Sequence, residues 1–305
     1  MITIEQRAEF RKHFRNNIPT RLMTDRIVKG VVFCCVVVAV VPLGSILIEV
    51  IRNGGPVLSV DFLTQIPGAV GSSQLGGVGP AIQGTLLLIG LSSLIGVPVG
   101  VLGGIFLSEF GSNKLGNTVR FFNDVLAEFP TIVIGLFAFV MIVLTFGSFS
   151  ILAGTFALSI IMLPIITRTT EESLKLVPVT YREAGYALGI KRWVVITRIL
   201  LTSAKSGLIT GIMLAVARIG GETAPLIFTI LGSSQFFSGL DQPVDALPLR
   251  IWRLSLLPYN SSIAEGWGAA LVLIMIVLSL NIGIRYIFLR KQGGGGGRFR
   301  IARGG

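Results

Sequence analysis

Residues 81–107 read AIQGTLLLIGLSSLIGVPVGVLGGIFL, a run without a charged side chain. A helix rises about 1.5 Å per residue, so this run is longer than the roughly 20 residues that cross a bilayer. It contains six glycines, and small residues favour close packing between transmembrane helices. The run therefore predicts a membrane-spanning helix that packs tightly against a neighbour.

Five other segments are also long and apolar enough to cross a membrane: residues 27–51, 129–146, 149–166, 207–231 and 266–289. The Gly147-Ser148 region alone separates the second and third of these, so a tight helical hairpin is expected there. The first segment is too long for a cleavable signal peptide and lacks a small-residue cleavage site, so we expect a retained helix. The sequence thus predicts an all-α integral membrane protein with six transmembrane helices.

The composition supports this class. Of the 305 residues, 52% are hydrophobic and 13% are charged, and the mean hydropathy is +0.80. Soluble domains have about 25% charged residues, so these values exclude a disordered chain and an ordinary cytosolic enzyme. The net charge of +11 would suggest nucleic acid binding in a soluble protein. Here 22 of the 26 lysines and arginines fall on one side of the predicted spans. The positive-inside rule then places both termini in the cytoplasm, and no nucleic acid partner is needed.

The spans divide the chain into predicted segments. These are a cytoplasmic N-terminal segment at 1–26, the first transmembrane helix at 27–51, an extracytoplasmic loop at 52–80, a core of five transmembrane helices at 81–290, and a flexible Gly-rich tail at 291–305. The core includes a long cytoplasmic loop at 167–206 and a second outer loop at 232–265. The outer loops are expected to be irregular.

The cytoplasmic loop at 167–206 is too polar to cross the membrane and too patterned for a simple linker. Thr180 and Glu183 have the spacing of a capping box, and Gly189 suits the left-handed end of a helix. The pattern predicts a short helix over 181–189, followed by a basic amphipathic stretch that suits a membrane interface. Two interpretations remain open: a connector between two spans, or a docking element for a cytoplasmic partner.

Two ionisable residues, Arg218 and Glu222, interrupt the apolar segment 207–231. A charge at this depth costs about 3 kcal/mol on insertion scales, so such groups usually face a cavity or one another. The i, i+4 spacing places both on one helix face. They form either a structural ion pair or an anion site, in which the forked guanidinium binds an oxyanion and Glu222 orients the arginine or accepts a proton. Arg168 is a second candidate for anion binding, with a snorkelling interfacial arginine as the alternative.

The chain lacks the motifs of catalysis. There is no Gly-x-x-x-x-Gly-Lys-Ser/Thr sequence, so any ATP hydrolysis belongs to another chain. The single histidine, His13, and the adjacent Cys34 and Cys35 provide neither a catalytic triad nor a metal site. An intramembrane enzyme would need a nucleophile, a metal or an acid pair, which Arg218 and Glu222 do not supply. We expect no catalytic residue, no metal and no cofactor in this chain.

Four stretches carry a resemblance to a known family: residues 127–135, 163–172, 183–189 and 218–226. The frame Glu183-Ala184-Gly185, three residues and Gly189 resembles the EAA loop of ABC-importer permeases, with Gly185 where alanine is usual. Residues 218–226 resemble the Arg-x-x-Gly-Glu-Thr-Ala-Pro-Leu signature of PstA-type permease subunits of phosphate ABC importers. The resemblance extends in order over about 80–290.

The resemblance implies the ABC type I importer permease fold, in which the cytoplasmic loop forms a coupling helix that inserts into the ATPase. The residues it implies are Arg218, Glu222 and Arg168 along the substrate pathway, and Glu183, Ala184, Gly185 and Gly189 in ATPase coupling. Its implied partners are a PstC-like second permease, a PstB-like ATPase dimer that binds ATP and Mg, a PstS-like extracytoplasmic phosphate-binding protein and membrane lipid. The alternatives are a permease for another oxyanion, such as sulfate or molybdate, and a purely structural membrane-assembly protein.

Overall fold

The computed structural model describes residues 18–69, 71 and 75–290, and every regular element in these ranges is helical. The all-α class predicted from the sequence is confirmed. Residues 70 and 72–74 of the predicted loop 52–80 lie outside the described residues, and so do parts of two other predicted segments. These are the first 17 residues of the N-terminal segment 1–26, and the tail at 291–305.

The chain divides into two units, and the first, residues 1–52, contains a single described helix. This helix, α2 (Ile18–Gly54), includes the predicted first span at 27–51 and begins earlier in the sequence. Pro42 lies inside it, and the Pro42 carbonyl accepts a hydrogen bond from Ser45 Oγ at 2.8 Å. Proline has no N–H, so the carbonyl of Val38, four residues earlier, lacks its usual helical donor.

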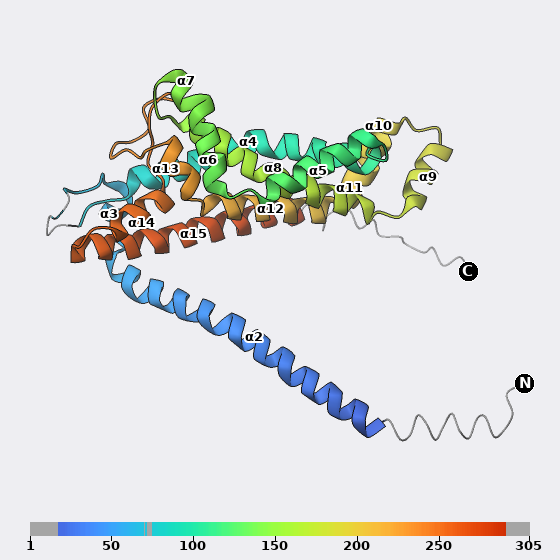
Figure 1. Cartoon of the computed structure of the whole chain (residues 1–305), viewed down its shortest axis with the longest axis horizontal. Coiled ribbons are helices and arrows are strands. Elements are labelled where there is room, and N and C mark those ends of the chain that lie inside the picture. The colour runs from blue at the N-terminus through green and yellow to red at the C-terminus, as the bar shows by residue number, and fades with distance from the viewer. Residues whose placement is uncertain (1–17, 70, 72–74, 291–305) are drawn as a thin grey trace, which may run out of the picture. The chain divides into compact units, whose positions relative to one another are not determined.

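The second unit, residues 53–305, is built around four long helices that run side by side (Figure 1). They are α4 (Gly79–Glu109), α8 (Ile151–Lys175), α12 (Lys205–Gly220) and α15 (Asn260–Arg290). α8 contacts both α4 and α12, and α12 also contacts α15. α9 (Val179–Ala187) lies at one end of this unit and α14 (Leu247–Ser255) at the other (Figure 1).

Glycines on α4 allow this helix to lie unusually close to α8. Three of them, one turn or more apart, face side chains of α8: Gly96 faces Met162, Gly100 faces Ile166 and Gly104 faces Thr170. A Cβ added at Gly104 would lie 2.5 Å from Thr170 Cβ. The tight packing predicted from the glycines is therefore confirmed, and these contacts help to form the main apolar core of the unit.

The predicted hairpin forms at Gly147, whose φ of +71° is easily adopted only by glycine. The helical segment before it is α6 (Thr131–Ala138), a π-helical turn η2 (Phe139–Val143) and α7 (Leu144–Phe146). Ser150 then caps α8 by accepting a hydrogen bond from the Ala153 N–H at 3.3 Å. α8 continues to Lys175, beyond the predicted end of the span at 166, because its polar last turns pack on neighbouring helices.

Residues 108–128, which join the predicted spans at 81–107 and 129–146, are not a simple connection, because they contain α5 (Lys114–Glu128). Asn113 caps α5 by accepting a hydrogen bond from the Gly116 N–H at 2.8 Å. The helix was missed because it is amphipathic and has no long apolar run. It bends by 102° into α6 at Pro130, which disfavours helical backbone in the preceding residue.

The predicted continuous span at 207–231 was also wrong. α12 ends at Gly220, and α13 (Ala224–Thr229) begins after a short break. Gly220 and Gly221 weaken the helix at this point, and Pro225 occupies the first turn of α13, where it needs no helical partner. Before α12, the chain bends by 73° after three short elements: α10 (Arg192–Val194), π-helical η3 (Val195–Leu200) and α11 (Leu201–Ser203).

The described residues include four helices that are long and apolar enough to cross a membrane, or six such spans if each bent pair counts as one. The predicted outer loops are more regular than expected. They contain three short helices in addition to irregular segments: η1 (Gly55–Val57), α3 (Val60–Thr64) and α14. Apolar side chains of these elements pack against α15, which accounts for their order.

Candidate functional site

The helix predicted in the cytoplasmic loop is present as α9 and ends at Gly189 as expected. Gly189 has a φ of +72°, and its N–H donates to the Tyr186 carbonyl at 2.9 Å. The Ile190 N–H donates to the Gly185 carbonyl at 3.1 Å, which completes a Schellman motif. The left-handed glycine thus turns the chain sharply from α9 towards α10.

The predicted capping box at the start of this helix was wrong. α9 begins at Val179, its N-cap residue is Pro178, and no side chain caps it. Thr180 and Glu183 therefore both lie inside the helix, where a hydroxyl cannot reach the first free N–H groups. The proline sets this boundary because it cannot continue the helical hydrogen bonding from α8.

Of the four residues predicted to act in ATPase coupling, three are exposed and one is buried. Glu183 and Ala184 are exposed on α9, and Gly189 is exposed at its end. Gly185 is buried, and a Cβ added there would lie 2.9 Å from Val195 Cγ2 in η3. The glycine therefore allows close packing of α9 on η3, which leaves the opposite face of α9 free for contact.

Exposed apolar side chains surround the free face of α9. Tyr186 is 42% exposed, Leu188 78% and Trp193 63%. Exposed large apolar side chains gathered on one short segment are typical of a protein contact site. The basic stretch after Gly189, predicted to lie at a membrane interface, instead turns Val195 and Ile196 inward, where both are buried in a small core.

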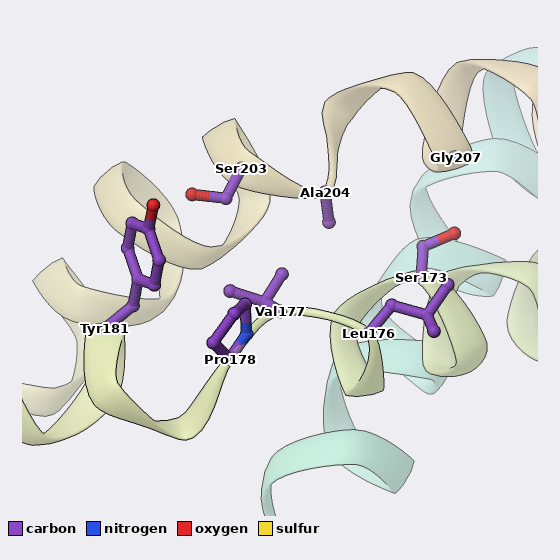
Figure 2. A pocket seen from close by; sticks show the side chains of 8 residues that line it. All are labelled: Ser173, Leu176, Val177, Pro178, Tyr181, Ser203, Ala204 and Gly207. Atoms are coloured by element: carbon purple, nitrogen blue, oxygen red, sulfur yellow. The ribbon is translucent and has the colours of Figure 1, made fainter.

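A pocket of about 350 Å³ lies behind α9 (Figure 2). It separates the end of α8 and the start of α9 from the bend between α11 and α12, and its lining residues are Ser173, Leu176, Val177, Pro178, Tyr181, Ser203, Ala204 and Gly207. The Ser173 hydroxyl donates to the Thr169 carbonyl at 2.6 Å, within its own helix. The pocket is thus an open space beside the 73° bend before α12.

Arg218 and Glu222 form the predicted ion pair, although on different elements from those expected. Arg218 lies in the last turn of α12, whereas Glu222 lies in the break before α13. Arg218 Nε and Glu222 Oε1 are 3.6 Å apart, which is an ion pair but too long for a hydrogen bond. The Arg218 side chain is 49% exposed and that of Glu222 is 14% exposed. The guanidinium therefore keeps donors available to another group.

Arg168 does not share a site with Arg218. It donates to Glu172 at 2.6 Å and pairs with Asp124 of α5 at 3.5 Å. Thr169, the next residue in the chain, contacts Gly211 of α12. Arg218 is seven residues beyond Gly211, which corresponds to about 10 Å along the helix at 1.5 Å per residue. Two carboxylates balance the charge of Arg168, so this arginine is the weaker candidate for an anion.

No sequence pattern indicates the ion pair between Arg182 of α9 and Glu109 at the end of α4. Arg182 Nη2 and Glu109 Oε1 are 2.8 Å apart, and the glutamate side chain is 4% exposed. The two residues are far apart in the chain, and neither belongs to a sequence motif that indicates a contact between them.

A second unforeseen ion pair lies near α14. Asp245 is buried, and its Oδ2 is 3.6 Å from Arg250 Nη1. Within the described residues neither Asp245 oxygen has a hydrogen-bond partner. Burial raises the pKa of the Asp245 carboxyl, against the opposing charges of Arg250 and Arg253. Asp245 lies between α13 and α14, outside the helices that are long enough to cross a membrane.

Residues 96–291, which include α9 and the Arg218–Glu222 pair, match the binding-protein-dependent transport system inner membrane component family. The chain belongs to this family. Membership in a family of inner membrane components accounts for the apolar helices. The family description also supports a location in a cell membrane.

Curated relatives within the family are similar over most of their length. The chain is 39% identical to the probable phosphate transport system permease protein PstA of Methanocaldococcus jannaschii, with 87% of this chain and 94% of the relative covered. It is 40% identical to the phosphate transport system permease protein PstA of Haemophilus influenzae, with 88% and 95% covered. It is 43% identical to that of Xylella fastidiosa strain Temecula1, with 79% and 84% covered.

Solved structures show the same fold at low sequence identity. A bacterial alginate ABC transporter, crystallised with a pentasaccharide-bound periplasmic protein, aligns with a TM-score of 0.64 and 14% identity, covering 90% of this chain and 98% of that chain. The MetNI methionine ABC transporter aligns with a TM-score of 0.56 and 19% identity, covering 70% and 94%. The chain thus has the type I permease fold of ABC importers, as the sequence resemblance implied.

Proposed function

We propose that this chain is a transmembrane permease subunit of an ATP-driven importer of inorganic phosphate. The observation that carries the proposal is its 39–43% identity, over most of the chain, to proteins named PstA. Its partners are then a PstC-like second permease, a PstB-like ATPase dimer that binds ATP and Mg, a PstS-like phosphate-binding protein and membrane lipid. The chain itself performs no covalent chemistry and binds no cofactor.

Arg218 gives the pathway its positive charge in this proposal. Phosphate carries one to two negative charges and needs a compensating cation in a low-dielectric path. A half-exposed arginine on a membrane helix is unfavourable in lipid, so a second permease must cover this face and enclose the pathway. Glu222 neutralises Arg218 when the pathway is empty, and this competition keeps phosphate binding weak enough for release. Arg168 is a second cation nearer to α9.

The exposed face of α9 couples the permease to ATP hydrolysis. Glu183 and Ala184 would contact a groove on the ATPase, while Gly185 and Gly189 set the position and the end of the helix. ATP-driven closure of the ATPase dimer would then pull on α9. The pocket behind α9 supports this role, because it leaves space for the displacement.

The function is tested by reconstituting the four partners in liposomes and measuring ATP-dependent uptake of radiolabelled phosphate. We expect uptake that excess sulfate or molybdate does not compete. Uptake of sulfate or molybdate in place of phosphate would identify the chain as a permease for that oxyanion. An assembled complex that hydrolyses ATP but imports none of the three would support a structural role.

Replacing Gly189 with leucine should weaken coupling without blocking insertion. An L-residue pays roughly 1–2 kcal/mol in the left-handed conformation, so the end of α9 would shift. If about 1 kcal/mol of this strain is lost from the binding free energy, the ATPase should bind about fivefold more weakly, because 1.4 kcal/mol corresponds to a factor of ten. Co-purification at several ATPase concentrations measures this change.

Gly147 provides a matched control for this experiment. Its φ of +71° is nearly that of Gly189, and neither glycine has an atom within 4 Å of an added Cβ. Gly147→Leu should thus cause the same local strain but leave ATPase binding unchanged. Glu183→Lys, on the exposed face, should weaken binding without strain. Normal assembly and uptake in both Gly189→Leu and Glu183→Lys would make the loop a connector only.

Both termini should be protected from protease added outside intact cells. The reason is the strong bias of basic residues to one side of the spans. Epitope tags at each end report protection, and a tag inserted in the 232–265 loop should be cleaved as the positive control. If that loop tag were cleaved only in inverted membrane vesicles, the orientation of the chain would be opposite to the proposed one.

A further inference from the structure

Two arginines, one in α9 and one in α10, contact the C-terminal end of α4. Arg182 of α9 donates to Glu109 Oε1 from Nε at 3.1 Å and from Nη2 at 2.8 Å. Arg192 of α10 donates to the Glu109 carbonyl, and its guanidinium carbon lies 4.0 Å from the centre of the Phe110 ring. These charge-assisted and cation–π contacts hold the turn against α4 at two points.

Arg182 also holds α9 to the end of α8. It donates to the carbonyls of Val177 and Leu174, both at 3.0 Å. The Arg182 side chain is 17% exposed and that of Glu109 4%. Removing one partner of a buried ion pair leaves the other charge without compensation, which is strongly unfavourable. The Arg182–Glu109 pair therefore binds α9 to the end of α4.

α4 connects this end of the unit with the opposite end. Its glycines pack on α8 along much of its length. Near its other end, Thr85 Oγ1 accepts a hydrogen bond from the Leu247 N–H of α14 at 2.9 Å. A Cβ added at Gly84 would meet the Asp245 carbonyl. A displacement of α4 at Glu109 would thus be transmitted to the segment that holds Asp245 and the start of α14.

We propose that Glu109 is a positioning residue that makes α9 and α4 move as one body during transport. Through Glu109, a pull on α9 is delivered to α4 and along it to the far end of the pathway. Glu109 touches no substrate in this role. The proposal rests on the function proposed above, because α9 must be the element that the ATPase moves.

The first test compares Glu109→Gln with the unmodified importer in liposomes and measures ATP hydrolysed per phosphate imported. Loss of the charge should raise this ratio about tenfold, within the range of coupling between linked sites. Glu171→Gln is the matched control, because Glu171 is 3% exposed and accepts from Arg120 at 2.8 Å. Arg120 lies in α5 and also donates to the carbonyls of Leu107 and Gly111 at the end of α4, so the Arg120–Glu171 pair joins α5 to α8 and does not involve α9. The ratio of ATP hydrolysed to phosphate imported should stay unchanged in Glu171→Gln.

The second test needs no substrate. Spin labels replace Leu102 of α4 and Val179 at the start of α9, which are 65% and 60% exposed, in a chain with Cys34 and Cys35 changed to serine. The assembled importer and the Glu171→Gln variant should give one narrow distance that is the same with and without ATP. Glu109→Gln should give a broader distribution that changes with ATP.

The two measurements separate the possible failures. An unchanged narrow distance together with an unchanged ATP-to-phosphate ratio in Glu109→Gln would overturn the positioning role. If the unmodified importer takes up no phosphate but its labels keep one narrow distance that Glu109→Gln broadens, the proposed substrate is wrong and the role of Glu109 is supported.

Discussion

Phosphate uptake should fall at least about 100-fold when Arg218 is replaced by glutamine, with the complex still assembled and ATP hydrolysis retained. This factor corresponds to about 2.7 kcal/mol, close to the cost of an uncompensated charge at membrane depth. Glutamine keeps the polarity and much of the length of the side chain but removes its charge. Because Arg218 is 49% exposed and lies 3.6 Å from Glu222, few packing contacts within the subunit are lost. Uptake by reconstituted importer, divided by the amount of complex, measures the effect.

Two further substitutions separate charge from geometry at this site. Arg218→Lys should restore uptake only in part, because lysine keeps the charge without the planar fork that pairs with oxyanions. Glu222→Gln should reduce uptake less than Arg218→Gln, since the glutamate moderates the site but does not hold the ion. If Arg218→Gln blocked assembly and the double change with Glu222→Gln restored uptake, the pair would be a structural ion pair instead.

The sequence predicted those features that a local pattern determines. Apolar runs long enough for a bilayer located the long helices, and the glycines of 81–107 predicted close packing against a neighbour, which α8 supplies. Gly189 was predicted as a helix end because left-handed backbone is a property of the residue itself. The resemblance in 218–226 correctly implied the family that the comparisons show.

Features that depend on tertiary contacts or on competing local signals were missed. Thr180 and Glu183 fit a capping box, but Pro178 starts the helix earlier. The end of α12 at Gly220 was not predicted, because the polar interruption is short and apolar residues resume at Ala224. The contact of Glu109 with Arg182 joins residues 73 positions apart, so no periodicity in the sequence could indicate it. The ion pair of Asp245 and Arg250 depends in the same way on burial that only the fold provides.

Replacing Gly104 with leucine should prevent most of the subunit from accumulating in a folded state. A Cβ at this position would lie 2.5 Å from Thr170 Cβ and 2.7 Å from the Thr167 carbonyl. Both neighbours belong to the body of α8, so the whole helix must move away to relieve the clash. Overpacking in a close interface costs about 1–3 kcal/mol, and the loss of the neighbouring glycine contacts adds to it. The measurements are the amount of inserted subunit and its thermal unfolding midpoint in detergent.

Gly90 on the same helix is the control that makes this result specific. It is exposed, and an added Cβ there meets no atom within 4 Å. Leucine has a better helix propensity than glycine by roughly 0.8 kcal/mol, so Gly90→Leu should leave the midpoint unchanged or raise it. Gly104→Ala adds only the Cβ and should fall between the two, because Thr170 and the Thr167 carbonyl still have to yield. Equal accumulation of Gly104→Leu and Gly90→Leu would mean that the approach of α4 to α8 is not what holds this unit together. The transmission along α4 inferred from Glu109 would then lack its mechanical basis, since a pull on a loosely packed helix would not reach Asp245.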